Sequence, residues 1–382
     1  MTSKVLLVNK FYAPTTGGIE TAVNQYAHWY QEAGHDITVL CCASERYLRS
    51  RHESVNGIPL IRSASLGNLL SVPISFAFFW HFLRLALKAD IVHINLQFPA
   101  ASLALYLFSK LIRARTIVSY HCDVYRQRNL KRLTYFFDRH SIRNADIVIT
   151  GSPALRQHSE VLRTIQRPMQ TLPYSVDERH VRKCLESPPK IAIPEHFRQD
   201  GYLLFFGRLV TYKGTESLER AFRRLMAEGK AVNLLVFGTG PEEHRFRQLA
   251  NEFPQRLHFV NEFVSDIDKY HLIRNCKVFL FPSVYYSEAF GITQLDAMAC
   301  GRAIINCWLE TGVNWVAPQG EGAFTLNPED DAALAKLMNA AFTGGLDLDE
   351  AGRQGHRRFQ ELFSEDRVRE QFCQIIASLA GT

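Results

Sequence analysis

Short runs of hydrophobic residues alternate along the whole chain with longer segments of mixed polarity. In the first half these runs occupy residues 4–9, 36–42, 57–62, 90–95, 116–121 and 146–150. In the second half they occupy residues 202–206, 233–237, 257–260, 278–281 and 303–306. Continuous apolar runs of this kind are typical of strands buried on both faces of a parallel sheet, and the segments between them suit helices. The pattern therefore predicts an α/β protein with two doubly wound, Rossmann-like domains.

The alternation breaks off between residues 176 and 200, where the chain contains SPPK and IPEH and has no clear periodicity. We predict an interdomain region there, with a first domain over residues 1–175 and a second over residues 201–364. Within the first domain, residues 73–88 predict a very apolar helix with Pro73 in its first turn. His81 and Arg84 interrupt it, which argues against a membrane span. Packing in the core and lying in a bilayer interface both remain open for this helix.

Composition restricts the class of protein. The 382 residues are 47% hydrophobic and 21% charged, which is ordinary for a globular protein with sizeable cores. The eight cysteines are scattered without C-x-x-C spacing, which indicates reduced thiols and no zinc site. The first apolar run is too short for a signal peptide, and no run is long enough for a membrane span. We therefore expect a cytoplasmic location.

The net charge of +6 contains a local excess. Residues 124–143 carry six Lys or Arg and one acidic residue, Asp138, with aromatic residues between them. The cluster at the start of this segment consists of Arg126, Arg128, Lys131 and Arg132. Such a segment is typical of contact with an anionic membrane surface or a phosphorylated acceptor, although a solvated helix face has the same pattern. One basic patch without a known nucleic-acid-binding motif does not indicate nucleic-acid binding.

The stretch 281–302, FPSVYYSEAFGITQLDAMACGR, has the most chemistry-bearing residues. Gly291 precedes a helix-like run, which leaves the N–H groups around Phe290, Gly291 and Ile292 free to bind an anion. Glu288 and Asp296 flank these groups and provide carboxylates for sugar hydroxyls. An ordinary strand–loop–helix unit has a similar pattern, so the interpretation depends on a second motif.

That motif is GRLVTYKG at residues 207–214, directly after an apolar run. Arg208 and Lys213 provide a guanidinium fork and a point charge, which suit a nucleoside diphosphate. They also stabilise charge on a leaving diphosphate. Cations are unfavourable at the positive end of a helix, which favours a functional interpretation. Two D-x-D sequences, at 266–268 and 347–349, are better interpreted as helix-start or turn acids than as metal ligands.

With these two motifs the chain resembles the retaining glycosyltransferases of family 4, which have the GT-B fold. The family signature E-x-F-G-x-x-x-x-E-A-M-A-x-G reads EAFGITQLDAMACG here, with Asp296 in place of the second Glu. The motif G-R-x-x-x-x-K-G matches at every fixed position. The resemblance implies two Rossmann-like domains that face each other across a cleft, and a C-terminal helix over residues 365–382 that crosses back onto the first domain. It implies that neither a metal nor a cofactor is needed.

The resemblance also implies roles for single residues. Arg208 and Lys213 hold the diphosphate, Glu288 contacts the sugar, and His121, at a strand end, closes the sugar pocket. The donor-binding positions that it implies are Gly17, Gly18, Asp123, Gly207, Val264, Phe290, Gly291, Ile292 and Asp296, the last on the ribose. We expect catalysis to depend on His121, Arg208, Lys213 and Glu288. Because no residue stands out as a covalent nucleophile, we favour front-face attack assisted by a diphosphate oxygen.

Residues 120–132, YHCDVYRQRNLKR, most resemble bacterial mannosyltransferases of O-antigen and lipopolysaccharide assembly. This narrower resemblance implies transfer of mannose from GDP-mannose to a saccharide or lipid-linked saccharide acceptor. It implies a peripheral position on the inner face of the cytoplasmic membrane. A UDP-sugar donor, a phosphorylase or sucrose- or trehalose-type enzyme of the same fold, and a non-catalytic sugar-nucleotide-binding protein remain alternatives.

Overall fold

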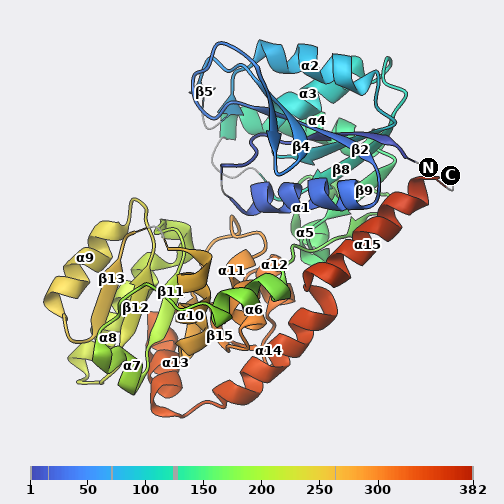
Figure 1. Cartoon of the computed structure of the whole chain (residues 1–382). Coiled ribbons are helices and arrows are strands. Elements are labelled where there is room, and N and C mark those ends of the chain that lie inside the picture. The colour runs from blue at the N-terminus through green and yellow to red at the C-terminus, as the bar shows by residue number, and fades with distance from the viewer. Residues whose placement is uncertain (1, 16, 70–71, 124–127, 263, 381–382) are drawn as a thin grey trace. The chain divides into compact units, whose positions relative to one another are not determined.

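The computed structural model describes residues 2–15, 17–69, 72–123, 128–262 and 264–380 (Figure 1). The chain divides into two compact units. Unit 1 consists of Met1–Tyr174 together with Arg369–Thr382, and unit 2 of Ser175–Val368. Among the described residues, no helix is both long and apolar enough to cross a membrane.

Unit 1 is built on an eight-stranded sheet with the order β10-β9-β8-β7-β1-β2-β4-β3. Its strands are β1 (Lys4–Val8), β2 (Asp36–Cys42), β3 (Arg51–Val55), β4 (Ile58–Ser63), β7 (Ile91–Leu96), β8 (Arg115–Tyr120), β9 (Ile147–Thr150) and β10 (Gln170–Thr171). Every neighbouring pair is parallel except β3 and β4. The chain leaves β1 toward β2 on one side and returns to β7 on the other, so the order reverses at β1. Open α/β sheets bind ligands at the carboxyl ends of strands beside such a reversal.

The helices of unit 1 cover both faces of this sheet. They are α1 (Gly18–Glu32), α2 (Phe76–Ala86), α3 (Pro99–Phe108), α4 (Arg128–Asn144) and α5 (Pro153–His158), with the 3₁₀ turn η1 (Leu162–Thr164). The inner faces of α2, α3 and α4 join strand residues in one buried cluster that includes Phe82, Ala104 and Tyr135. Figure 1 shows α2 and α3 on one side of the sheet and α1 on the other.

The start of α2 differs from the sequence prediction. Pro73 does not lie in its first turn but in β6 (Val72–Pro73), which pairs with β5 (Asn68–Leu69) in a short hairpin. The helix begins at Phe76, because the Ser75 hydroxyl accepts a hydrogen bond from the Phe78 N–H at 3.1 Å and so caps the helix. A helix capped by Ser75 and a helix with Pro73 in its first turn both fit the sequence pattern, so the pattern alone does not predict which of the two starts is used.

The end of the chain returns to unit 1. Phe372 in α15 (Glu365–Ala377) stacks on Tyr26 of α1 with ring centroids 5.3 Å apart, and it meets Tyr30 edge-on at 4.9 Å. Aromatic pairs at these separations add to the burial of apolar surface. The last part of α15 is therefore an integral part of the core beside α1.

Unit 2 contains a six-stranded, fully parallel sheet with the order β13-β12-β11-β14-β15-β16. Its strands are β11 (Leu203–Phe206), β12 (Leu234–Phe237), β13 (Leu257–Val260), β14 (Val278–Phe281), β15 (Ile304–Cys307) and β16 (Ala323–Leu326). The order reverses between β11 and β14, and this is the second place where a ligand site is expected. Both units are thus doubly wound, as the alternation of apolar runs predicts.

The helices of unit 2 begin earlier in the chain than expected. Residues 176–200, predicted as an interdomain region, form α6 (Glu178–Glu186) and α7 (Glu195–Asp200) and belong to unit 2. The remaining helices are η2 (Thr211–Lys213), α8 (Thr215–Ala227), α9 (Glu243–Glu252), α10 (Asp266–Asn275), α11 (Ile292–Ala299), α12 (Gly312–Val316), α13 (Asp331–Thr343) and α14 (Leu348–Leu362). In α6 only Val181 and Cys184 are buried, so its apolar periodicity is too short to stand out in the sequence.

Candidate active site

The two motifs of unit 2 meet at the carboxyl ends of β11 and β14. The Lys213 ammonium lies 2.5 Å from Glu288 Oε2, and both side chains are largely buried. The Ser283 hydroxyl lies 3.5 Å from the same carboxylate oxygen. The sequence predicts Glu288 as a sugar contact and Lys213 as a diphosphate contact. In the structure these two residues form an ion pair with each other. Such a pair places a positive and a negative charge where the sheet order reverses.

The backbone around Gly214 makes this contact possible. Gly214 has φ 73° and precedes α8, and a Cβ there would lie 1.8 Å from the Pro282 carbonyl oxygen at the end of β14. The Val284 N–H donates to the Tyr212 carbonyl at 2.9 Å and ties the two loops together. Only glycine fits both the left-handed conformation and the close approach. The final glycine of GRLVTYKG thus fixes the position of Lys213 relative to β14.

Arg208 is exposed in the loop that follows β11, the same loop that carries Lys213. Within the part of the chain that the structure describes, its guanidinium takes part in no hydrogen bond or ion pair. Its neighbour Gly207 lies against the turn after β12, since a Cβ on Gly238 would lie 1.9 Å from the Gly207 carbonyl oxygen. The strand ends therefore fix the backbone of Arg208, while its charged group remains available to an anion.

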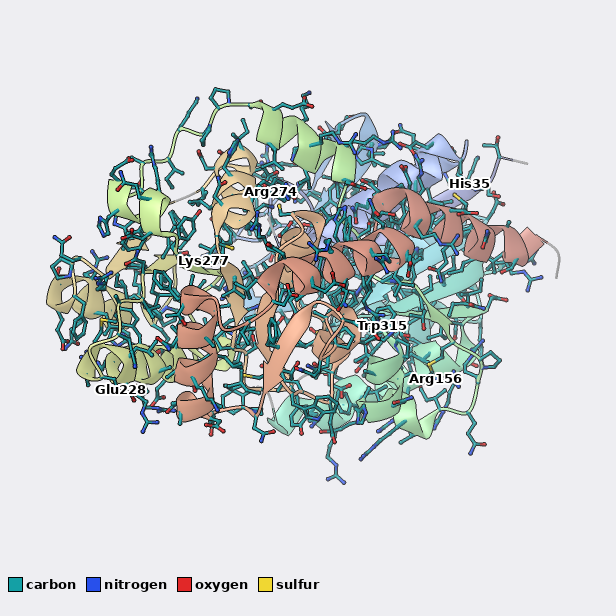
Figure 2. The ribbon with its side chains drawn as sticks, turned by 90° about the horizontal axis from the view of Figure 1, so that it is seen from below. His35, Arg156, Glu228, Arg274, Lys277 and Trp315 are labelled. Carbon is teal, nitrogen blue, oxygen red and sulfur yellow. The ribbon has the colours of Figure 1, made fainter. Side chains whose placement is uncertain are left out.

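The start of α11 also has the predicted form. Gly291 precedes the helix with φ 81° and offers no side-chain cap. The Gln294 N–H donates to the Gly291 carbonyl at 2.9 Å, so the N–H groups of Ile292 and Thr293 are the ones without an acceptor inside the helix. Phe290 is buried, with its ring centroid 6.1 Å from that of Trp315 and 6.2 Å from that of Phe363. Trp315 is labelled in Figure 2. The Phe290 side chain anchors the loop, and its backbone alone can face a ligand.

Asp296 lies in α11 and its carboxylate points to α10. It accepts a hydrogen bond from the Tyr270 hydroxyl at 3.0 Å and lies 3.5 Å from the Lys269 ammonium. Burial acts to lower the pKa of Lys269, but the carboxylates of Asp296 and Asp266 outweigh it and leave that pKa raised. The cation is therefore retained beside Asp296. Lys269 and Tyr270 were not among the predicted site residues, although a lysine next to a tyrosine in the first half of a helix is a sequence signal for partners of a carboxylate.

Side chains from α11, β15 and α10 form a further polar network that holds α11 in place. The buried Gln294 side chain donates to the Val313 carbonyl at 3.1 Å and accepts from Asn306 of β15 at 2.9 Å. Arg274, labelled in Figure 2, donates to the Cys300 carbonyl just beyond the end of α11 at 2.7 Å. Buried amides that are fully paired fix one arrangement of neighbouring elements. These contacts hold the helix start in place and were not predicted.

In unit 1, His121 directly follows β8 and is buried. Its Nδ1 lies 2.7 Å from the Tyr174 hydroxyl, and its Nε2 lies 2.9 Å from Asn95 Oδ1. Asn95 donates its own amide to the Val8 carbonyl, so its oxygen faces the ring and Nε2 carries the proton. Burial lowers the pKa of His121 to about 4, so the ring is neutral at pH 7. Both ring nitrogens are engaged, and His121 offers no free general base in this arrangement.

Asp123 is equally engaged. Its carboxylate accepts from the Tyr120 hydroxyl at 2.6 Å, the Ser159 hydroxyl at 2.7 Å and the Glu160 N–H at 2.8 Å. These bonds join the end of β8 to the segment before η1. A donor-binding role for Asp123 stays a prediction, and a ligand would have to compete with three existing donors.

The other predicted site residues are spread over both units. Gly17 and Gly18 lie at the start of α1, after the central strand β1, and Val264 is half-buried between β13 and α10. Arg128 and Lys131 lie in α4 with Arg132, and Lys131 pairs with Glu160 at 2.7 Å. Arg126 lies outside the described residues. In the described ranges there is no group of three or more His, Cys, Asp or Glu placed to hold a metal.

Comparison with known families accounts for both units. A model described as "Glycosyl transferase 4-like domain" matches residues 17–174, and one described as "Glycosyl transferases group 1" matches residues 187–358. The chain belongs to the group 1 glycosyltransferases. This glycosyltransferase is an enzyme of the hexosyltransferase class, and its two Rossmann-like units are those of the GT-B fold.

Curated relatives and solved structures agree with this assignment. The glycosyltransferase is 27% identical over 380 residues to the O-antigen chain mannosyltransferase C of Escherichia coli, covering 98% of each chain. It is 28% identical over 369 residues to the D-rhamnosyltransferase WbpZ of Pseudomonas aeruginosa, covering 94% of this chain and 92% of the relative. An Anabaena protein solved in complex with UDP has the same fold, with a TM-score of 0.73, 16% identity and coverage of 98% and 100%.

Proposed function

We propose that this glycosyltransferase transfers mannose from GDP-mannose, with retention of the anomeric configuration, to a lipid-linked saccharide during synthesis of a bacterial surface polysaccharide. The observation that carries the proposal is the ion pair of Lys213 and Glu288 between the ends of β11 and β14, with the exposed Arg208 in the same loop as Lys213. The mannosyl and rhamnosyl relatives support a hexose of this type and a cell-surface product. The acceptor would be held at the inner face of the cytoplasmic membrane.

The residues of unit 2 suggest how the donor is held. Arg208 and Lys213 bind the diphosphate, and the N–H groups at the start of α11 bind a phosphate or a sugar hydroxyl. When the diphosphate approaches, Lys213 exchanges part of its contact with Glu288 for the phosphate oxygens. Glu288 is then free to accept a hydrogen bond from a sugar hydroxyl. Asp296, oriented by Tyr270 and Lys269, binds the ribose.

Bond cleavage then follows from charge stabilisation. As the glycosidic bond lengthens, negative charge grows on the leaving diphosphate, and the two cations stabilise it more than they stabilise the ground state. A diphosphate oxygen takes the proton of the acceptor hydroxyl, which attacks from the same face. This mechanism needs no protein nucleophile and no metal. His121 is neutral with both nitrogens engaged, so we assign it a positioning role rather than proton transfer.

A nucleotide panel tests the proposal directly. Ligands that bind only the folded protein raise its melting temperature in proportion to RT ln(1 + [L]/Kd). We expect GDP and GDP-mannose to raise it, and UDP and ADP to have a much smaller effect. In the Arg208→Ala variant the GDP effect should disappear, whereas Lys230→Ala, at an exposed position of unit 2, should retain it.

The panel also separates the alternatives. A selective response to UDP and UDP-sugars would retain the site but replace the donor, in line with the Anabaena structure that contains UDP. Donor binding without release of nucleoside diphosphate, in the presence of lipid-linked acceptor, would favour a non-catalytic sugar-nucleotide-binding protein. A response to no nucleotide would contradict the proposed site.

A further inference from the structure

Helix α2 has hydrophobic residues on both of its sides. Phe78 and Phe82 are buried in the core of unit 1. On the opposite side, Phe76 is 78% exposed and Trp80 is 65% exposed, with Leu87 exposed just beyond the end of the helix. Surface helices normally present polar residues on this side. The outward stripe of α2 is therefore not explained by packing within the unit.

Helices α3 and α4 lie in the same layer as α2. Phe82 of α2 packs on Phe108 of α3 with ring centroids 6.5 Å apart, and Tyr106 of α3 packs on Phe136 of α4 at 5.8 Å. The three helices thus form one layer over the sheet. Further hydrophobic side chains are exposed on this layer at Tyr106, Leu107, Leu111, Leu133 and Phe136. We call the outer side of these three helices, with the turns that follow α2 and α3, the α2–α4 face.

The charge of the α2–α4 face has one sign. Residues 76–88 contain two Lys or Arg, residues 99–113 contain two and residues 128–144 contain five. The same three segments contain one acidic residue, Asp138, and it is buried. Arg84 of α2 and Lys88, two residues beyond its end, are exposed. A surface that combines exposed aromatic side chains with cations, and has no exposed acid within these three segments, complements an anionic lipid surface.

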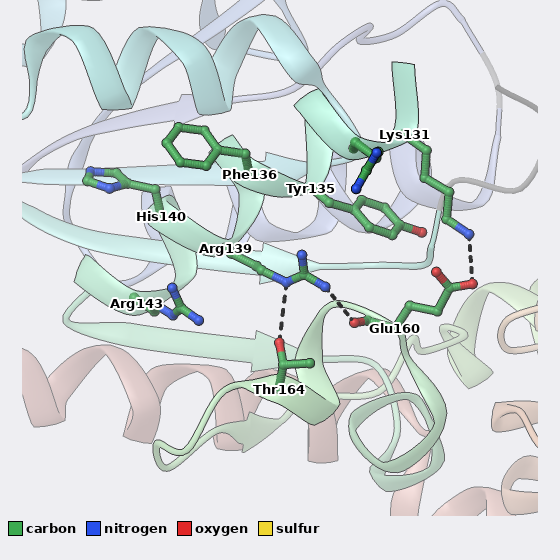
Figure 3. A pocket seen from close by; sticks show the side chains of 9 residues that line it. Lys131, Tyr135, Phe136, Arg139, His140, Arg143, Glu160 and Thr164 are labelled. Carbon is green, nitrogen blue, oxygen red and sulfur yellow. Dashed lines mark hydrogen bonds and ion pairs between the residues drawn. The ribbon is translucent and has the colours of Figure 1, made fainter. Parts of the chain in front are cut away.

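A cavity beside α4 extends the basic character of this face. Its volume is about 860 Å³, and its lining includes Arg132, Arg139, His140 and Arg143 together with one acid, Glu160, which pairs with Lys131 (Figure 3). Arg139 donates to the Glu160 carbonyl at 3.0 Å, and its Nε lies 3.3 Å from the Thr164 hydroxyl. Arg143, labelled in Figure 3, is exposed at the cavity wall. A cavity of this size with several cations at its wall suits a phosphate group at the edge of a lipid surface.

From these observations we infer that the α2–α4 face is the surface by which this protein binds an anionic phospholipid bilayer. Phe76, Trp80 and Leu87 insert into the headgroup region, and the cations around them contact lipid phosphates. A second copy of the chain is a poor occupant, because it would place one positive face against another. A nucleic acid would satisfy the cations but would leave the exposed aliphatic side chains without a partner.

Cosedimentation of the full chain with vesicles tests this inference without nucleotide or acceptor. We expect binding to vesicles of phosphatidylcholine with about a third phosphatidylglycerol, and at least about tenfold weaker binding to phosphatidylcholine alone. Binding should fall as the salt concentration rises, because screening weakens the attraction. Equal binding to both kinds of vesicle, or binding to neither, would overturn the inference.

Two pairs of variants locate the surface. Trp80→Ser should weaken binding to the anionic vesicles at least about fivefold, whereas Trp308→Ser, at an exposed tryptophan of unit 2, should not. The double variant Arg84→Glu/Lys88→Glu should weaken it at least about tenfold, while Lys230→Glu/Lys336→Glu, with the same change of net charge at exposed positions of unit 2, should not. All six positions in the test variants and controls are exposed, so the fold should tolerate the substitutions.

The outcomes distinguish this inference from its competitors. If both charge variants weaken binding equally, the attraction is general and the α2–α4 face is not the docking surface. If RNA displaces the protein from vesicles at low concentration and Trp80→Ser has no effect, the cations serve a nucleic acid instead. If the protein binds vesicles but responds to no nucleotide, the inference about the α2–α4 face stands and only the proposed transfer reaction is contradicted.

Discussion

The ion pair of Lys213 and Glu288 brings together two residues with different proposed roles, one as a diphosphate contact and one as a sugar contact. Its side chains are 14% and 11% exposed, so removing one partner leaves a poorly solvated charge behind. Both residues lie at the reversal point of the unit 2 sheet, where the leaving group and the sugar of a donor would have to be contacted. The exposed Arg208 has no such protein partner among the described residues, and its charge is available to the ligand from the start.

We predict that Lys213→Ala and Arg208→Ala each lower turnover about 10²–10³-fold, as loss of one preorganised electrostatic donor does elsewhere. The measurement is release of nucleoside diphosphate from the donor in the presence of acceptor. The two variants should differ in stability, because only Lys213→Ala leaves a carboxylate unpaired. A retained rate in either variant would remove that residue from the site, and Lys230→Ala is the matched control.

Asp138, beneath the α2–α4 face, allows a second prediction at this scale. Burial raises the pKa of Asp138 to about 7, although a hydrogen bond from Ser102 acts to lower it. Its Oδ1 has no hydrogen-bond partner among the described residues. Between pH 4 and 7 the folded protein therefore holds a proton that the unfolded chain has lost. The stability that this proton gives is complete below pH 4 and is lost as the pH rises to about 7.

Asp138→Asn should remove this dependence. The variant should be more stable than the natural chain at pH 8, and the advantage should shrink by about 1.4 kcal/mol for each pH unit below 7. Urea unfolding of both proteins at pH 5, 6, 7 and 8 measures the difference. Parallel pH profiles would mean that Asp138 ionises normally in the folded state.

Among the elements, the turn between β11 and α8 decides where Lys213 lies. Gly214 supplies a backbone conformation that other residues rarely adopt, and its α-carbon lies against the carbonyl group of Pro282. The contact fixes the distance between the loop after β11 and the loop after β14. The sequence motif contains this glycine, but its function as a spacer between two loops appears only in the folded chain.

Gly214→Ala should therefore separate the two loops and pull Lys213 away from Glu288. We expect a loss of turnover of about tenfold or more and a drop in stability of roughly 2 kcal/mol or more, from overpacking against the backbone. Gly229→Ala is the matched control, because Gly229 has φ 68° and a Cβ there meets nothing within 4 Å. It has the same backbone strain without the clash. Equal effects of the two substitutions on turnover would contradict the spacer function.

At the scale of the whole molecule, buried histidines make unit 1 sensitive to acid. Burial lowers the pKa of His93 to about 3 and that of His121 to about 4. The unfolded chain binds protons at both positions below pH 6.5, and the folded chain does not. Stability is therefore complete above pH 6.5 and falls with decreasing pH, by about 1.4 kcal/mol per pH unit for each histidine. Between pH 7 and 4, protonation of Asp138 stabilises the folded chain as the pH falls, and this offsets the loss of stability from one of the two histidines.

Hydrogen exchange on peptides from β7 and β8 checks this behaviour. We expect their protection to fall between pH 6.5 and 5, after correction for the intrinsic exchange rate, while peptides from β14 and β15 in unit 2 change less. His121→Gln should flatten the profile of unit 1, whatever its effect on absolute stability. A profile for β7 and β8 that does not depend on pH would mean that the two histidines can take up protons in the folded protein.

The sequence by itself determined the parallel α/β architecture and the strand ends at which the GRLVTYKG and EAFG motifs lie. This succeeded because short apolar runs, glycine turns and fixed motif spacings are local properties, and the structure places them in β1, β8, β11 and β14 as expected. Local signals failed where packing decides: Ser75 rather than Pro73 begins α2, and residues 176–200 form α6 and α7.

Only the tertiary structure decided which groups meet. Lys213 and Glu288 are far apart in the sequence and pair because β11 and β14 are neighbours. The neutral, fully engaged state of His121 depends on Asn95 and Tyr174, which other strands and loops deliver. The outward side of α2 is exposed because α3 and the sheet pack only against its inner side. Contacts between distant segments and the burial of single side chains follow from the fold, and a pattern of hydrophobic positions does not contain them.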